Sequence, residues 1–267
     1  MPDWLHTVLL AIVEGITEFL PVSSTGHLLI AEKLLHSPDF LKTDLFNIVI
    51  QSGAVIAVIP LFKERFHQFL HRWSEPATQS YLLKLIFAFC ITGAGGYILD
   101  KKGLKLPEEL RPVGIALLAG GIVFLAVEYF IRNKKLGTEI TWTVAVAVGL
   151  GQLVAAVFPG ASRSGTTIML SLLLGLSRPA ATEFSFLVSI PTMLAAGGWK
   201  IFRALHHPAM DAPHENWSMV LLGTVVAAIV SFVAVKWLLR YVQSHTFNAF
   251  GWYRIAVGGL VLALLLK

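Results

Sequence analysis

The 267-residue sequence is poor in charged side chains, which make up 14% of the chain, whereas soluble domains average about 25%. Hydrophobic residues account for 55%. This composition excludes an ordinary soluble domain and predicts a polytopic membrane protein. The formal net charge of +5 comes from basic residues clustered beside apolar segments, as the positive-inside bias requires. We therefore expect a lipid bilayer as the partner and no nucleic acid.

Cysteine is almost absent as well. The single cysteine, Cys90, cannot form a disulfide within the chain, so a disulfide-stabilised scaffold is excluded. A basic segment before the first apolar run is also missing, and residues 1–13 lack the pattern of a cleavable signal peptide. We expect the first apolar run to remain in the mature protein and treat residues 1–267 as a single membrane domain.

The chain is rich in long apolar runs. A helix that spans a bilayer needs about 20 apolar residues. A run at 184–203 is long enough, although Pro191 and a Gly pair interrupt it. Five further runs fit better: 45–62, 81–99, 112–131, 217–239 and 249–266.

Two other apolar stretches, 5–35 and 141–176, are too long for one span and too short for two. Each has a proline and a polar, glycine-containing turn at its centre. Non-helical backbone at membrane depth is tolerated only where protein buries it or where it lines a watery cavity. We interpret both stretches as re-entrant helical hairpins. The predicted fold is all-α, with six spans and two re-entrant hairpins.

Basic residues predict the orientation of these segments. Lys and Arg follow the spans 45–62 and 112–131, and two spans separate these loops, so both should be cytoplasmic. Both termini are then extracytoplasmic. The loop 206–216 has no Lys or Arg and fits the outer side, whereas the loop 100–111 is basic and fits it poorly.

An internal repeat relates the two halves of the chain. Gln152 lies 138 positions after Glu14, and both residues are seven positions before a proline. The pattern Pro-x-Ser-x-x-Gly at 21–26 returns at 159–165 with one residue inserted, and the Gly-Gly pair at 120–121 returns at 258–259. The halves, about 1–137 and 138–267, would each hold one hairpin and three spans. Three intervening spans make the repeat inverted, so the two turns can meet.

Two carboxylates lie in the first hairpin. Glu14 and Glu18 are four residues apart and therefore share one helix face. Ionisable residues in a membrane segment are costly and usually mark a functional site. Pro21 then interrupts the helix. The turn that follows carries three hydroxyls and an imidazole, from Ser23, Ser24, Thr25 and His27.

The second hairpin carries Arg163 at its turn. A planar guanidinium suits phosphate oxygens, and a helix that begins after the turn directs its positive end at an anion. Four hydroxyls surround this arginine, those of Ser162, Ser164, Thr166 and Thr167.

Together the two turns suit a phosphate ester or pyrophosphate site within the membrane. Glu14 and Glu18 suit a hard divalent cation, Mg²⁺ or Ca²⁺, that could bridge to phosphate. Ser24 and His27 suit a nucleophile and a general acid or base. Water or a serine would attack phosphorus, while Arg163 and the metal neutralise the developing charge.

These residues also have structural interpretations. The two carboxylates could simply form a buried ion pair with Arg163. His27 could be a hydrogen-bonded core histidine, and the hydroxyls of the first turn could satisfy backbone groups around a broken helix. Arg163 is the hardest to explain in this way, because a guanidinium in an apolar segment is costly.

The two turns carry a family resemblance. Residues 14–27, EGITEFLPVSSTGH, resemble the signature of the bacterial undecaprenyl-diphosphate phosphatases, the bacitracin-resistance protein family. Residues 159–167, PGASRSGTT, resemble its second signature, and 183–187 and 253–254 also resemble family segments. The likeness extends from near residue 8 to the C-terminus.

The resemblance implies an enzyme of the bacterial plasma membrane that hydrolyses undecaprenyl diphosphate to undecaprenyl phosphate and inorganic phosphate. This reaction recycles the lipid carrier for peptidoglycan synthesis and confers bacitracin resistance. The resemblance also implies dependence on a divalent metal and a site open to the extracytoplasmic side. By position, Glu14, Glu18, Ser24, His27 and Arg163 are implied as catalytic, and the two Glu also as metal ligands. The implied substrate contacts are Arg163 together with Ser23, Thr25, Ser162, Ser164 and Thr167.

Two rival interpretations remain open. Inverted repeats with broken helices are also transporter architecture, so the chain could carry a lipid phosphate across the membrane. A second family of membrane lipid phosphatases has a Pro-Ser-Gly-His motif that residues 24–27 partly match, but the paired His and Asp that this family needs are missing here.

The chain could also assemble as a homodimer.

Overall fold

The computed structural model describes residues 1–102, 109–206 and 216–266. These residues form eleven α-helices and two short 3₁₀ helices, Asp39–Leu41 and Ile59–Phe62, and the only β-type pairing among them is one isolated bridge between Gly137 and Leu176. The α-helices are α1 Asp3–Thr17, α2 Ser24–Leu35, α3 Asp44–Val58, α4 Lys63–His71, α5 Pro76–Lys101, α6 Leu110–Ile131, α7 Trp142–Val157, α8 Arg163–Leu173, α9 Arg178–His206, α10 Trp217–Tyr241 and α11 Asn248–Leu265.

Six helical segments are long and apolar enough to cross a membrane. They coincide with the six predicted spans, so the prediction of an all-helical, multi-pass protein with six candidate spans is confirmed. Residues 103–108 and 207–215, which belong to the two loops used to predict orientation, lie outside the described residues. The six segments are Leu45–His71, Pro76–Lys101, Leu110–Ile131, Arg178–His206, Trp217–Tyr241 and Asn248–Leu265.

The expected interruption at Pro191 is wrong, because α9 continues through this proline. A proline frees a backbone carbonyl in the preceding turn, and hydroxyls and neighbouring helices can compensate for this loss in a membrane helix. Thr192 donates to the carbonyl of Val188 beside the proline. Gly197 does not break the helix either. It allows α9 to approach α3, because a Cβ there would lie 1.9 Å from the Ser52 hydroxyl.

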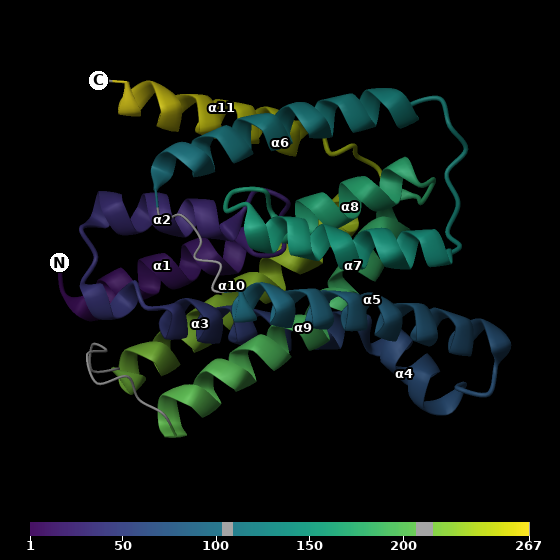
Figure 1. Ribbon diagram of the computed structural model, residues 1–267, viewed down its shortest axis with the longest axis horizontal. Coiled ribbons are helices and arrows are strands. Elements are labelled where there is room, and N and C mark those ends of the chain that lie inside the picture. The colour runs from purple at the N-terminus through teal and green to yellow at the C-terminus, as the bar shows by residue number, and fades with distance from the viewer. Residues whose placement is uncertain (103–108, 207–215, 267) are drawn as a thin grey trace.

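The two remaining stretches form helix pairs, α1 with α2 and α7 with α8, each joined by a short non-helical turn. Figure 1 shows both pairs in the middle of the molecule with their turns close together. The α1–α2 pair extends from its turn toward the end that holds both chain termini, and the α7–α8 pair extends toward the opposite end.

The other helices enclose these two pairs. α6 packs along α11 on one side, while α3 packs between α9 and α10 on the other. α1 packs against α10, and α7 packs against α5. The larger apolar core includes residues of α5, α8 and α9, and a smaller core lies between α1, α2, α3 and α10. Both turns are therefore surrounded by protein, which is the setting that broken backbone requires in an apolar region.

Candidate active site

The first turn ends in an unusual backbone conformation at Ser23. This residue has φ of 78°, a left-handed value that is rare outside glycine, and it is the N-cap of α2. Its hydroxyl accepts a hydrogen bond from the backbone N–H of Gly26 at 3.3 Å. Ser24 therefore occupies the first position of α2, at the positive end of the helix.

The second turn repeats this device. Ser162 has φ of 69°, is the N-cap of α8, and accepts a hydrogen bond from the N–H of Gly165 at 3.2 Å. Arg163 occupies the first position of α8, as Ser24 does in α2. Gly160, at φ of 96°, has no room for a side chain, because a Cβ would lie 2.8 Å from the Val113 carbonyl. The two helix N-termini offer backbone N–H groups of the kind that bind anions.

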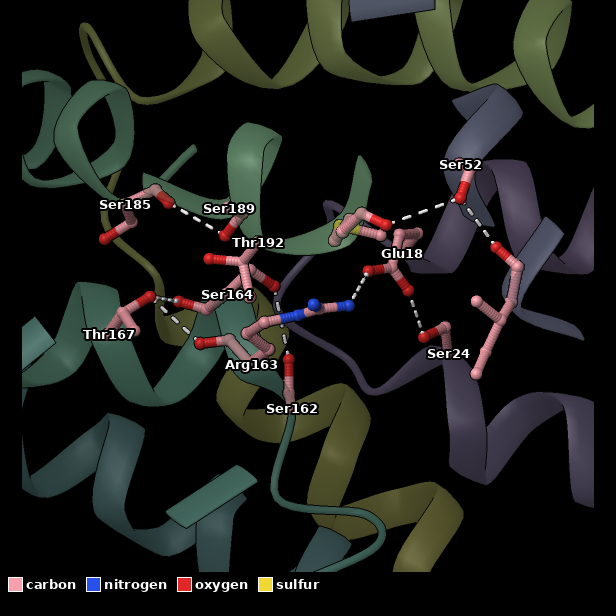
Figure 2. A network of polar contacts seen from close by, with 12 residues as sticks. Glu18, Ser24, Ser52, Ser162, Arg163, Ser164, Thr167, Ser185, Ser189 and Thr192 are labelled. Carbon is pink, nitrogen blue, oxygen red and sulfur yellow. Dashed lines mark hydrogen bonds and ion pairs between the residues drawn. The ribbon is translucent and has the colours of Figure 1, made fainter. Parts of the chain in front are cut away.

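Direct contacts join the two turns. The Ser164 hydroxyl donates to the Leu20 carbonyl at 3.3 Å, across 144 positions of sequence. Nη2 of Arg163 donates to Oε1 of Glu18 at 2.6 Å, and Figure 2 shows this arginine reaching from α8 toward the carboxylate. The meeting of the two turns expected from the repeat is therefore present in the structure.

Glu18 lies between Arg163 and Ser24. Its Oε2 accepts a hydrogen bond from the Ser24 hydroxyl at 2.5 Å, while its Oε1 accepts from Arg163 (Figure 2). The Glu18 side chain is 3% exposed and that of Arg163 is 25% exposed. A carboxylate that accepts the proton of a serine hydroxyl is the arrangement of a nucleophile with its base. The ion pair alone would also fit a structural role.

Two other ion pairs help to separate these roles. Arg178 donates to both carboxylate oxygens of Glu128, and Arg65 donates to Glu183. None of these four residues lines the cavity that holds Glu18 and Arg163. These two pairs connect α9 to α6 and to α4. The Arg163–Glu18 pair instead lines the cavity.

The cavity at the two turns has a volume of about 300 Å³. It holds Glu18 and Arg163 together with four of the predicted hydroxyl residues, Ser23, Ser24, Thr25 and Ser162. A larger and more open cavity of about 510 Å³ lies along α4, lined by Lys63, Glu64, His67, Gln68 and Arg72, and contains no predicted site residue. The chemistry therefore belongs to the smaller cavity.

Four polar residues of this cavity were not predicted as site residues. Gln51, Thr92 and Thr192 come from α3, α5 and α9, whose apolar sequences predict only membrane spans. Gln152, from α7, is 2% exposed, and neither polar atom of its amide has a hydrogen-bond partner among the described residues. Its place in the repeat, opposite Glu14, was the one available signal.

Glu14 is fully buried, and within the described part of the chain neither of its carboxylate oxygens has a hydrogen-bond partner. Glu18 and Glu32 place like charge near it. A buried carboxylate without a donor requires a proton or a cation. Glu14 does not line the cavity that holds Glu18, so its role as a metal ligand stays a prediction. Among the described residues no group of three or more His, Cys, Asp or Glu is placed to hold a metal ion. Two carboxylates would therefore need further ligands from the substrate.

His27 and Ser24 have different hydrogen-bond partners. Its Nδ1 donates to the Ser23 carbonyl at 2.7 Å, because a carbonyl can only accept. In the neutral ring Nε2 then accepts from the Tyr253 hydroxyl at 2.8 Å, and the two rings stack. His27 does not line the cavity, and Glu18 occupies the place beside Ser24 expected for a base. A catalytic role for His27 remains a prediction.

The remaining predicted contacts stabilise the second turn. The Ser164 hydroxyl lies 3.3 Å from that of Ser162. The Thr167 hydroxyl donates to the Arg163 carbonyl at 2.9 Å and is fully buried. Neither Ser164 nor Thr167 lines the cavity, so both hold the start of α8 in place.

The chain is similar to known proteins over almost its whole length. The family model "Bacitracin resistance protein BacA" matches residues 7–260. An undecaprenyl-diphosphatase of Rhizobium etli (strain CIAT 652) is 46% identical over 263 residues, covering 98% of this chain and 97% of the relative. An undecaprenyl-diphosphatase of Xylella fastidiosa (strain 9a5c) is 46% identical over 266 residues, covering 99% of this chain and 100% of the relative. The chain belongs to the bacitracin resistance protein BacA family.

Proposed function

We propose that this chain hydrolyses undecaprenyl diphosphate to undecaprenyl phosphate and inorganic phosphate in the bacterial plasma membrane. The relatives named undecaprenyl-diphosphatase support the reaction and its lipid substrate. The observation that carries the proposal is the Arg163–Glu18–Ser24 chain of hydrogen bonds in a cavity between two helix N-termini. The product returns to peptidoglycan synthesis, and its regeneration accounts for bacitracin resistance.

The diphosphate binds at Arg163. Nη2 of this guanidinium bonds Glu18, and its other donors remain for phosphate oxygens. The N-termini of α2 and α8 add the positive ends of two helices. The buried cavity strengthens these interactions, because the effective dielectric constant is lower there than in water.

Ser24 attacks the terminal phosphorus. Glu18 accepts the hydroxyl proton while the bond from phosphorus to the bridging oxygen breaks and undecaprenyl phosphate leaves. Water then cleaves the phosphoserine and releases inorganic phosphate, and Ser24 regains its proton. Arg163 stabilises the charge on the phosphate oxygens in both steps. The short Ser24–Glu18 hydrogen bond favours serine over directly activated water as the first nucleophile.

A divalent cation, Mg²⁺ or Ca²⁺, fits Glu14 and Glu18. These cations take oxygen ligands and can share them between carboxylates and phosphate. When bound, the metal would neutralise charge on the diphosphate. The buried carboxylate of Glu14, which has no hydrogen-bond partner among the described residues, supports this assignment.

The proposal includes an inverted repeat with two re-entrant hairpins, in halves of about 1–137 and 138–267. Its support is the matched capping at Ser23 and Ser162, the opposite directions of the two helix pairs in Figure 1, and the matched packing of α1 on α10 and α7 on α5. An opening toward the extracytoplasmic side is expected from the family resemblance.

A lipid-phosphate transporter is the second candidate function. Two helices broken at related positions, with a polar cavity between them, also suit alternating access. Assays of purified protein in liposomes distinguish the phosphatase from the transporter. Phosphate release supports hydrolysis, whereas lipid translocation without phosphate release would support the transporter and contradict hydrolysis.

Substitution of Arg163 by Lys should lower kcat/KM by about 10²-fold or more, because one ammonium cannot reproduce the fork that binds phosphate. Phosphate release from undecaprenyl diphosphate by purified protein measures this. Arg132→Lys is the matched control at an exposed arginine and should be unchanged. Full activity of Arg163→Lys would show that the guanidinium of Arg163 is not needed to bind the diphosphate.

Substitution of Glu18 by Gln should lower kcat by about 10²- to 10⁴-fold, because an amide cannot accept the Ser24 proton. Rapid quenching of the unsubstituted enzyme with labelled substrate should trap phosphate on Ser24, and Ser24→Ala should trap none. Glu139→Gln, at an exposed position, is the control. Phosphate release by Ser24→Ala at the normal rate would make water the nucleophile.

Substitution of Glu14 by Gln should weaken metal binding, because one of two carboxylate ligands is lost. Mn²⁺ binding to the purified protein, followed by electron paramagnetic resonance, measures this without reference to activity. Unchanged affinity in the double variant Glu14→Gln/Glu18→Gln would show that the metal binds elsewhere.

A further inference from the structure

Arg254 of α11 is completely buried. Its guanidinium contacts both turns of the site. Nη1 donates to the Pro21 carbonyl of the first turn at 3.3 Å, and Nη2 lies 3.0 Å from the Gly160 carbonyl and 3.2 Å from the Ala161 carbonyl of the second. Nη2 also lies 3.3 Å from the Ala116 carbonyl of α6. One side chain thus connects both turns to α6 and α11.

The partners of Arg254 are backbone carbonyls and not a carboxylate. Among the described residues it forms no ion pair within 4.0 Å, unlike Arg65, Arg163 and Arg178. Broken helices leave carbonyl groups without intrahelical donors, and such groups are costly in an apolar interior. A guanidinium can satisfy several of them because it presents five N–H donors in a fixed plane. The Phe124 ring lies under this guanidinium, with its centroid 5.4 Å from Cζ.

α6 leaves room for this guanidinium at Gly120. A Cβ at Gly120 would lie 2.1 Å from Nη2 of Arg254 and 2.8 Å from its Cζ. Even an alanine would therefore push the guanidinium away from its carbonyl partners. Gly259 belongs to the Gly-Gly pair of α11 that repeats the pair at Gly120. A Cβ at Gly259 would meet no neighbouring helix within 4 Å in the part of the chain that the structure describes.

We propose that Arg254 is a positioning residue that fixes the two turns against each other, so that Glu18 can reach Ser24 and Arg163 at once. Arg254 does not line the cavity, so it acts through the turns and not on the substrate. Its neighbour Tyr253 bonds His27 of α2 at 2.8 Å, so α11 holds the first hairpin at two adjacent points. The activity readout rests on the proposed phosphatase function.

The test compares Arg254→Lys and Gly120→Ala with Gly259→Ala as the control, using full-length protein that elutes as a single folded species. Both test variants should lower kcat by about 10²-fold, the effect of displacing a catalytic group by about 1 Å. Gly259→Ala should be unchanged. Gly120→Ala keeps the arginine and its charge, so it remains informative if Arg254→Lys fails to fold. Near-normal kcat for both Gly120→Ala and folded Arg254→Lys would overturn the proposal.

A double-mutant cycle separates positioning from general stability. In an Arg163→Lys background, Arg254→Lys should lower kcat/KM only a few-fold. The reason is that the Glu18–Arg163 contact, which Arg254 is proposed to maintain, is already disrupted there. An equal fold-loss in both backgrounds would show a merely structural role and overturn the proposal.

A cross-linking readout does not depend on activity. Thr25 of α2 and Ala156 of α7 line the cavity from the two hairpins and are both exposed. The triple variant Thr25→Cys/Ala156→Cys/Cys90→Ser should react with a short bifunctional thiol reagent to give an internal cross-link. Gly120→Ala should lower the yield and Gly259→Ala should not. An unchanged yield in Gly120→Ala would refute the positioning role, whereas absent phosphate release by the unsubstituted enzyme would refute only the proposed function.

Discussion

The long helices of this protein are arranged around the contact between two broken helix pairs. Each turn exposes backbone groups and polar side chains in a region of the chain too apolar to solvate them. The turns satisfy these groups mutually, through Ser164 with Leu20 and Arg163 with Glu18, and through Arg254 behind both. The six long helices enclose this contact. Without the contact between the turns, a carboxylate and a guanidinium would each be buried without a partner. An unpaired buried charge strongly destabilises the folded state.

The proposed repeat would account for the unlike halves of this site. Ser23 and Ser162 share a left-handed conformation and the same capping bond, so the α1–α2 and α7–α8 pairs use one backbone design at their turns. The side chains differ at the positions that carry chemistry. The first half has Glu14 where the second has Gln152, and Arg163 comes from the second half alone. Glu18 and Ser24 come from the first turn and Arg163 from the second, so their hydrogen-bonded chain exists only where the two turns meet.

Much of this arrangement could be predicted from the sequence because membrane burial makes polar residues conspicuous. The six spans, the two broken stretches and the cavity residues Glu18, Ser24 and Arg163 all followed from apolar length and from polar residues within it. Contacts between distant segments could not be predicted in this way. The binding of His27 to Tyr253, across 226 positions, depends on how α11 packs. Gln51, Thr92 and Thr192 are single polar residues in apolar spans, which periodicity cannot distinguish from satisfied core positions. The continuous helix through Pro191 depends on compensation by neighbours.

A double-mutant cycle between Glu18 and Arg163 shows whether the two turns act as one site. The measured quantity is kcat/KM for undecaprenyl diphosphate in Glu18→Gln, Arg163→Gln and the double variant. If the two side chains work as one unit across the meeting turns, the double variant should be about as impaired as the more impaired single variant. Losses that multiply would show that the two residues act independently and that the two turns do not form one catalytic unit.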